Sequence, residues 1–323
     1  MPYSVDQLAE QAGLSLENLE WLAAQMPTGD GLLYVQRRHR KKHGGIREVV
    51  ELKPPFKDVS KNLHRDFTDR FSYEVPDHVH GFIRGRSTIS NASQHLAKRC
   101  VLRMDLEDFF PSIGAATVRA SLREQGYEEK AVELAVNLVT IGGKLPIGLS
   151  TSPLFSNLSF RSTDHSLAEY ARSEGLSFTR YVDDLTFSGD VADRHFVDIA
   201  RILDEAGWSV NTRKTAFMRR GGPQYVTGLY VGEPGGPRIP RNLKRRMRWI
   251  SHVISNFGYD VYMADFGGEA DGMYPRRLLG WARYIAAVEP DVGYPLLRAF
   301  TGLALEEDAE DLDGYEEDLN DMP

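Results

Sequence analysis

Residues 181–184, with the sequence Tyr-Val-Asp-Asp, constrain the fold more than any other part of this 323-residue chain. They join two short runs rich in β-forming residues, 177–180 and 185–188, which predicts two strands connected by a tight turn. Neighbouring side chains on an extended strand point to opposite faces, so only such a turn could bring the Asp183 and Asp184 carboxylates towards one metal cluster. The two carboxylates repel each other unless a divalent cation binds them. An Asp-rich polar turn is the common alternative.

Composition excludes several classes of protein. The 41% hydrophobic and 10% aromatic content fits a globular chain with room for two or three subdomains. Cys100 is the only cysteine, which rules out an intrachain disulfide and fits a reducing compartment. The sequence has no apolar run of the roughly 18 residues that a spanning helix needs, and no signal-peptide pattern. We therefore expect a cytoplasmic protein without a membrane span.

The net charge of −7 hides an uneven distribution. Residues 306–321 hold ten acidic residues and no lysine or arginine; without them, 39 basic residues stand against 36 acidic ones. The basic residues gather in two clusters. A single cluster is usually solvated surface charge, but two on a nearly neutral body favour a polyanionic partner. The first cluster comprises Arg37, Arg38, Arg40, Lys41, Lys42 and Arg47, and the second Arg241, Lys244, Arg245, Arg246 and Arg248.

Hydrophobic periodicity and turn residues divide the chain into helices and strands. Ser4 and Ser15 are plausible N-caps and Gly13 a C-cap for two short helices near the N-terminus. Helices are predicted over 4–26 (as a pair), 56–73, 115–140, 153–173 and 191–206, and from 241 onward; strands over 100–105 and 208–211; hairpins over 32–52, around the Asp pair and over 215–231; and a Pro/Gly linker over 234–240.

The segment that begins at residue 241 predicts an amphipathic helix with a cationic stripe. Its basic residues fall at i, i+3, i+4 and i+7, which places them on one face of a helix. These basic residues are Arg241, Lys244, Arg245 and Arg248, and the apolar residues on the opposite face are Leu243, Met247, Ile250 and Ile254.

A third carboxylate follows an apolar run. Asp105 ends a predicted strand that Pro111 stops soon afterwards, a position from which a carboxylate can reach a cleft. With Asp183 and Asp184 it gives three carboxylates from two strands. Two divalent ions roughly 3.5–4 Å apart can activate an attacking hydroxyl and stabilise a leaving pyrophosphate oxygen. Oxygen ligands without thiolates or histidine favour Mg²⁺ over zinc.

Taken in order, these segments resemble the motifs of a reverse transcriptase. The resemblance covers about residues 30–300 and rests on five motifs in the expected order, which is far more specific than any one motif. The motifs are the finger motif at 81–87, the first catalytic motif around Asp105, the template and nucleotide loop at 145–153, the second catalytic motif at 181–184, and the next palm motif at 211–215.

Two shorter elements make the chain similar to the bacterial retron reverse transcriptases in particular. Asn91 and His95 fit an Asn-Ala-x-x-His element, and residues 226–228 fit a Val-Thr-Gly element near the palm–thumb junction. Separately, each has an ordinary explanation, a helix start and a hairpin. Together and in these places they favour a retron enzyme over a group II intron enzyme.

The resemblance implies roles for the residues of the catalytic motifs. Asp105, Asp183 and Asp184 would bind two Mg²⁺ ions, with the backbone carbonyl of Leu106 as a further ligand. Lys214 would protonate or electrostatically assist the departing pyrophosphate.

The resemblance also implies a nucleotide pocket. Phe110 would be a steric gate whose ring leaves no room for a 2′-hydroxyl; a core aromatic is the alternative. Arg47, in the finger hairpin, could hold the triphosphate through bidentate hydrogen bonds. Gly148 belongs to the nucleotide loop, which usually reads Pro-Gln-Gly. Here Ile147 replaces the glutamine and cannot donate its hydrogen bonds, which leaves room for a defence-associated reverse transcriptase outside the retrons.

The implied fold is an α+β right-hand polymerase with fingers, a palm made of an antiparallel sheet backed by helices, and a short helical thumb. The implied RNA-binding residues belong to the two retron elements and the cationic helix. They are Asn91, His95, Val226, Thr227, Gly228, Arg241, Lys244, Arg245 and Arg248. The expected divisions are an N-terminal helical segment (1–30), fingers (31–100), palm (101–235, with finger helices around 115–145), thumb (236–302) and a disordered acidic tail (303–323).

The implied activity is RNA-directed DNA synthesis from deoxynucleoside triphosphates. A retron enzyme would copy part of its own structured non-coding RNA from a 2′-hydroxyl, giving branched RNA–DNA (msDNA) in antiphage defence, often with a separate effector protein. One alternative is another defence-associated or group II intron-like reverse transcriptase, which primes on protein or polymerises without a template. The other is an inactive RNA-binding module, against which the three retained aspartates argue.

Overall fold

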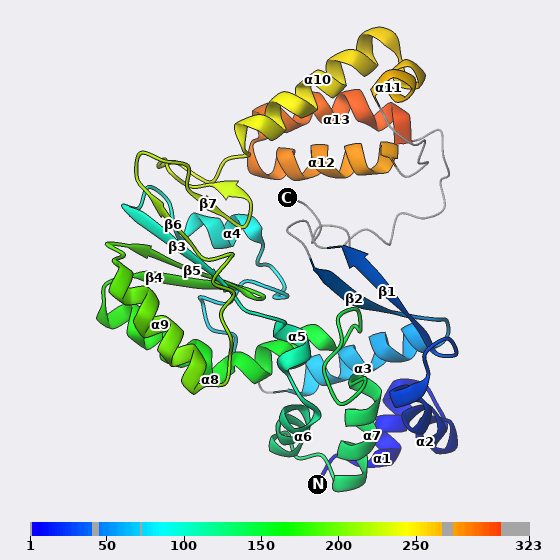
Figure 1. Cartoon of the computed structure of the whole chain (residues 1–323). Helices are drawn as coiled ribbons and strands as arrows, with labels where there is room; N and C mark the ends of the chain where they lie inside the picture. Colours follow the sequence, from blue (N-terminus) through cyan, green and yellow to red (C-terminus); the bar gives the residue numbers. More distant parts are fainter. Residues whose placement is uncertain (1, 41–44, 72, 267–273, 305–323) are drawn as a thin grey trace. The chain divides into compact units, whose positions relative to one another are not determined.

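The computed structural model describes residues 2–40, 45–71, 73–266 and 274–304, and the chain divides into two compact units (Figure 1). Lys41, Lys42 and, from residue 305 on, the expected acidic tail lie outside the described residues. The first unit comprises Met1–Gly85, Arg103–Leu185 and Ala192–Thr215, and the second unit Arg86–Leu102, Thr186–Val191 and Ala216–Pro323.

A four-stranded sheet has the strand order β4-β5-β3-β6. Strands β3 (Cys100–Asp105) and β5 (Asp184–Gly189) contribute residues to both units, whereas β4 (Ser177–Tyr181) belongs to the first and β6 (Ala216–Arg219) to the second. Only two residues separate β4 from β5, so these neighbours run antiparallel, and the hairpin predicted around the Asp pair is confirmed. The last residue of β3 and the first residue of β5 are both aspartates on adjacent strands.

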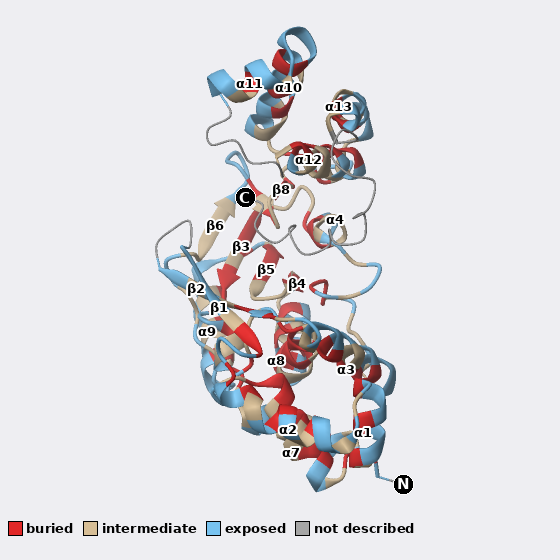
Figure 2. Cartoon of the chain, turned by 90° about the vertical axis from the view of Figure 1, so that its right-hand side faces the viewer, coloured by how far each residue is buried: buried red, intermediate tan, exposed pale blue. Residues whose placement is uncertain are grey.

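Helices make up most of the rest of the first unit, and Figure 2 shows that they bury one side and expose the other. The predicted caps are confirmed: Ser4 forms a capping box with Gln7, Gly13 ends the first helix at φ 75°, and Ser15 caps the second. The helices are α1 (Val5–Ala12), α2 (Leu16–Gln25), the 3-10 turn Met26–Thr28, α3 (Phe56–Arg70), α5 (Phe109–Ser112), α6 (Ala115–Glu124), α7 (Glu129–Val139), α8 (Ser152–Ser173) and α9 (Asp193–Glu205).

A separate antiparallel hairpin in the first unit consists of β1 (Tyr34–Arg40) and β2 (Ile46–Leu52), as predicted. Its base is buried, with Tyr34 opposite Leu52, and the strands become exposed towards their basic ends. The hairpin is therefore anchored in the interior at one end and exposes its basic residues at the other.

The second unit contains a short helix, a two-stranded hairpin and a bundle of helices. The predicted apolar face of its first long helix is confirmed, because Met247, Ile250 and Ile254 are buried in a core with Leu278 and Phe300. Its elements are α4 (Thr88–Ser93), β7 (Tyr225–Val226), β8 (Leu229–Tyr230), α10 (Arg241–Phe257), α11 (Tyr259–Phe266), α12 (Tyr274–Val288) and α13 (Pro290–Ala304).

Two predicted elements differ from the structure. In place of a strand over 208–211, Val210 alone forms a bridge with Leu106, because turn residues follow at once. In place of one hairpin over 215–231, β6 joins β3 in the sheet, and β7 and β8 form a separate small hairpin. Alternation identifies a strand but not its partner. Within the described residues, no helix combines the length and the hydropathy needed to cross a bilayer.

Candidate active site

The turn between β4 and β5 is strained. Val182 has a φ of 60°, a left-handed conformation that a β-branched residue rarely adopts and that costs on the order of 1–3 kcal/mol. Gly81 leaves room for this turn, since a Cβ atom there would lie 2.4 Å from the Val182 nitrogen. The backbone therefore holds Asp183 and Asp184 in an unfavourable turn, which suits an active site better than a plain polar loop.

Backbone hydrogen bonds join this turn to the end of β3. The Leu106 amide donates to the Asp183 carbonyl (3.1 Å), and the Asn211 amide donates to the Asp105 carbonyl (2.8 Å). In the bridge between Leu106 and Val210, the hydrogen bonds are made by the Asp105 carbonyl and the Glu107 amide. The Leu106 carbonyl takes no part in this bridge. Asp105 and the Asp pair, about 80 positions apart in sequence, thus meet at one place in the first unit.

The three carboxylates carry an excess of negative charge. Burial, and then the neighbouring carboxylates, raise the pKa of Asp184 to about 7. Burial and the charge of Asp105 also raise the pKa of Asp183, while Lys214 and Arg47 act in the opposite direction. The Lys214 ammonium donates to Oδ1 of Asp105 (2.8 Å) and so supplies one compensating charge. Repulsion of this kind is relieved when a cation binds.

The donor chemistry fits a hard divalent cation, although the side chains alone do not form a complete shell. Among the described residues, no group of three or more His, Cys, Asp or Glu side chains is arranged to hold a metal ion. Mg²⁺ is usually bound by one or two carboxylates, with water and substrate phosphate completing its shell. The oxygen donors and the raised pKa values of the Asp pair match that incomplete type of site.

Arg103 is a charged residue near the carboxylates that the sequence analysis did not identify. Arg103 lowers the pKa of Asp184, against the larger effects of burial and of the neighbouring carboxylates. It lies two residues before Asp105 on β3, and side chains at i and i+2 share a face of a strand. The alternation of that strand could therefore have identified it.

Aromatic rings surround the predicted steric gate. Phe110, in α5, is half-buried and lies edge-on to Phe82, with ring centroids 6.1 Å apart. Phe109 is buried and packs edge-on against Phe110, with ring centroids 5.5 Å apart. Phe82 is 42% exposed with a φ of 60°, so it adds an exposed ring that the motif match alone did not single out. The Phe110 ring thus lies between an exposed ring and a buried one, and its role as a steric gate stays a prediction.

The nucleotide loop is fastened to the β1–β2 hairpin that carries Arg47. The Val50 amide donates to the Ile147 carbonyl (2.8 Å), so the contact uses the backbone and not the side chain of residue 147. Gly148 has a φ of 110°, and a Cβ atom there would lie 2.1 Å from the Val50 carbonyl oxygen. The loop therefore requires glycine at 148 but tolerates Ile147.

The two short retron-like elements meet in the second unit, where α4 packs on β7 and β8. Asn91 and His95 are 1% and 0% exposed, and Nδ1 of His95 lies 2.6 Å from the Ser188 hydroxyl. The Thr227 hydroxyl donates to the Thr88 carbonyl (3.0 Å). Val226 is fully buried, and Gly228 has a φ of 78°. Asn91, His95 and Val226 are interior residues here, so they support the surrounding surface.

The cationic helix α10 separates its basic residues into two kinds. Arg241, Arg245 and Arg248 are exposed, as the stripe predicts. Lys244 is only 17% exposed, and its ammonium donates to both carboxylate oxygens of Glu289, at 2.9 and 3.0 Å. The three arginines of the stripe thus remain on the solvent side, as does Arg246, while Lys244 pairs with Glu289, the residue just before α13.

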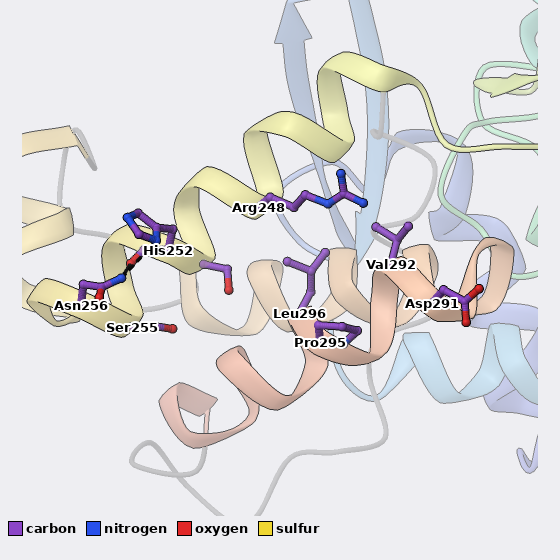
Figure 3. A pocket seen from close by; sticks show the side chains of 9 residues that line it. Arg248, His252, Ser255, Asn256, Asp291, Val292, Pro295 and Leu296 are labelled. Atoms are coloured by element: carbon purple, nitrogen blue, oxygen red, sulfur yellow. Dashed lines mark hydrogen bonds between the residues drawn. The ribbon is translucent and has the colours of Figure 1, made fainter.

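The second unit also holds an open groove of about 470 Å³ between α10 and α13 (Figure 3). Polar side chains of α10 form one wall, and a largely apolar segment of α13 forms the other. None of the carboxylates described above lines it. Its lining residues are Arg248, Ser251, His252, Ser255, Asn256, Asp291, Val292, Pro295 and Leu296.

The chain is similar to known reverse transcriptases. Residues 39–259 match the family described as reverse transcriptase (RNA-dependent DNA polymerase). The chain is 34% identical to the retron Mx65 reverse transcriptase of Myxococcus xanthus over 76% of this chain and 62% of that protein. It is 33% identical to the retron Ec86 reverse transcriptase of Escherichia coli over 71% of this chain and 72% of that protein. It is 29% identical to the retron Mx162 reverse transcriptase of Myxococcus xanthus over 93% of this chain and 67% of that protein.

Proposed function

This chain belongs to the reverse transcriptases of bacterial retrons, and we propose that it copies part of a structured RNA partner into DNA. The observation that carries the proposal is the meeting of Asp105 with the strained Asp183–Asp184 turn inside a reverse transcriptase domain. The substrates would be deoxynucleoside triphosphates and an RNA template.

Two Mg²⁺ ions at these carboxylates would lower the pKa of the attacking hydroxyl and neutralise charge on the departing pyrophosphate. Asp105, Asp183, Asp184 and the Leu106 carbonyl are the proposed ligands. Lys214, which lies against Asp105, would stabilise or protonate the pyrophosphate once substrate draws its ammonium away from the carboxylate.

Three residues are proposed to bind the incoming nucleotide. Phe110 would block a 2′-hydroxyl with its half-buried ring. Arg47 would hold the triphosphate from the hairpin. Gly148 would let the nucleotide loop lie close to that hairpin, where the Ile147 carbonyl accepts a hydrogen bond from the Val50 amide.

We propose that the expected division into fingers, palm and thumb applies, with α10 and the three exposed arginines of its stripe as the thumb element that grips RNA or template–primer. Asn91, His95, Val226, Thr227 and Gly228 would shape an adjoining RNA-binding surface. The RNA would be the chain's own non-coding RNA, primed at a 2′-hydroxyl to give branched RNA–DNA, in antiphage defence with a separate effector.

The experiment is to purify the protein with its bound nucleic acid and sequence that nucleic acid. A branched RNA–DNA molecule with a 2′–5′ linkage supports the proposed priming. DNA attached to a protein side chain, or DNA unrelated to the bound RNA, refutes it in favour of a protein-primed or untemplated enzyme.

A further inference from the structure

Arg180 is the largest fully buried side chain in the described part of the first unit, and it lies two residues before the catalytic turn. It pairs with Asp164 of α8, and both side chains are 0% exposed. A buried ion pair is weak evidence for stability, because well-packed apolar residues often replace one at no cost. Its presence beside the turn therefore calls for another explanation.

The geometry of the pair leaves one donor directed at the turn. Nε and Nη2 of Arg180 donate to the two carboxylate oxygens of Asp164, at 2.8 and 2.6 Å. The guanidinium also lies over the Phe160 ring, 4.9 Å from its centroid. Carboxylate and ring together fix the plane of the guanidinium. Nη1 then donates to the Val182 carbonyl at 3.1 Å.

Val182 is the residue whose conformation most needs holding. Its φ of 60° determines where the next peptide, and hence the Asp183 side chain, points. Three features restrict it: the Arg180 guanidinium donates to its carbonyl, a Cβ atom at Gly81 would lie 2.4 Å from its nitrogen, and the Leu106 amide donates to the carbonyl of the next residue, Asp183. Asn157 of α8 in turn donates to the Gly81 carbonyl (3.2 Å).

We infer that Arg180, oriented by Asp164, is a positioning residue that holds the Val182 carbonyl and so keeps Asp183 and Asp184 directed at the reacting phosphate. Arg180 does not touch substrate. The inference rests on the proposed polymerase function, and it assigns α8 a role in catalysis through Asp164 and Asn157.

The first test replaces both charges at once, with Asp164→Leu and Arg180→Met in the full chain with its bound RNA. No unpaired charge remains buried, so the fold should persist. We expect kcat for DNA synthesis to fall about 10²-fold, because small misplacements of reacting groups cost that much, with the KM for deoxynucleotide changed less than about threefold. Mn²⁺ titrated alone, followed by electron paramagnetic resonance, should bind several-fold more weakly.

The matched control removes another bidentate pair of the first unit. Arg119 donates from Nε and Nη2 to Glu133, at 2.6 and 2.9 Å, on helices α6 and α7. Arg119→Met with Glu133→Leu should leave kcat and Mn²⁺ binding unchanged.

The second test is Arg180→Lys. This variant keeps a positive charge beside Asp164, so we expect it to fold. Lysine can pair with Asp164 but has no rigid fork to reach Val182 as well. A low kcat in this variant supports positioning; full kcat and full Mn²⁺ affinity overturn it, because charge balance alone would then suffice. Wild-type protein that binds Mn²⁺ but makes no DNA would refute the polymerase proposal, while the Mn²⁺ comparison among the variants still decides the role of Arg180.

Discussion

Two regions of the molecule gather like charges: the acidic turn of the first unit and the basic helix α10 of the second. They differ in how far these charges are exposed to water. Asp183 and Asp184 sit in a strained turn where burial and their neighbours raise their pKa values. The arginines of α10 stand on an exposed helix face, where water screens them at little cost. The turn therefore holds its charges at a cost in stability, whereas the helix carries its charges on a solvated face and keeps its fold through a separate apolar face.

Among substitutions that keep all three carboxylates, the largest effect is expected beside the turn, at the steric gate. Phe110→Ala removes the ring that would meet a 2′-hydroxyl, so ribonucleotide incorporation relative to deoxynucleotide should rise about 10²-fold, the upper range for a change in pocket shape. The measurement is the ratio of kcat/KM values for the two sugars. Phe109→Leu, on the buried side, is the control; unchanged discrimination in Phe110→Ala would show that the ring is only part of the core.

A smaller effect is expected on the basic helix. Replacing Arg241, Arg245 and Arg248 by glutamine should weaken RNA binding about tenfold near physiological salt and reduce the slope of log K against log salt by about 2 to 3. The fold should persist, because these side chains lie opposite the apolar face. The measurement is fluorescence anisotropy from 50 to 300 mM salt.

Lys244→Gln is the matched control for that set. It breaks the pair with Glu289, so it should lower the melting temperature slightly and leave the salt slope nearly unchanged. An equal loss of slope in Lys244→Gln, or no loss in the triple variant, would remove the distinction between the two kinds of basic residue.

The smallest effect concerns stability at the turn. With its pKa raised to about 7, Asp184 keeps a proton in the folded chain that the unfolded chain releases near pH 4. Stability from this group is thus present at low pH and is lost as pH rises from about 4 to about 7. Asp184→Asn cannot ionise, so its melting temperature relative to wild type should rise by a few degrees between pH 4.5 and pH 8 without metal.

Adding Mg²⁺ at pH 8 should narrow that difference, because the cation stabilises the wild-type carboxylate. Differential scanning fluorimetry at matched ionic strength measures both. A difference that stays flat with pH would mean that the carboxylate is not strained by burial and repulsion.

The two regions also differ in how far sequence reasoning could reach. The stripe of α10 follows from helical period alone, and so do its buried residues Met247 and Ile250. Lys244 differs from the other residues of the stripe because it pairs with Glu289. Glu289 lies 45 positions away in the sequence, so no local pattern could predict the pair. Periodicity therefore predicts faces of helices but not which charges find partners.

At the turn, the three aspartates were identifiable because ordered motifs mark them. The residues that hold the turn in place could not be identified from the sequence. Arg180 and Asp164 come from a strand and a helix whose local patterns are ordinary, and only the fold brings them to the Val182 carbonyl. The partner of β6 was missed for the same reason, since pairing is decided by tertiary packing.

The central claim is that the carboxylates at the end of β3 and at the β4–β5 turn catalyse DNA synthesis. The most direct measurement is DNA production by the full chain, purified with its own RNA, in wild type and in the Asp183→Asn, Asp184→Asn double variant. We predict that the variant folds, retains its RNA and makes at least about 10³-fold less DNA. Undiminished DNA synthesis by a folded, RNA-bound double variant would contradict the account.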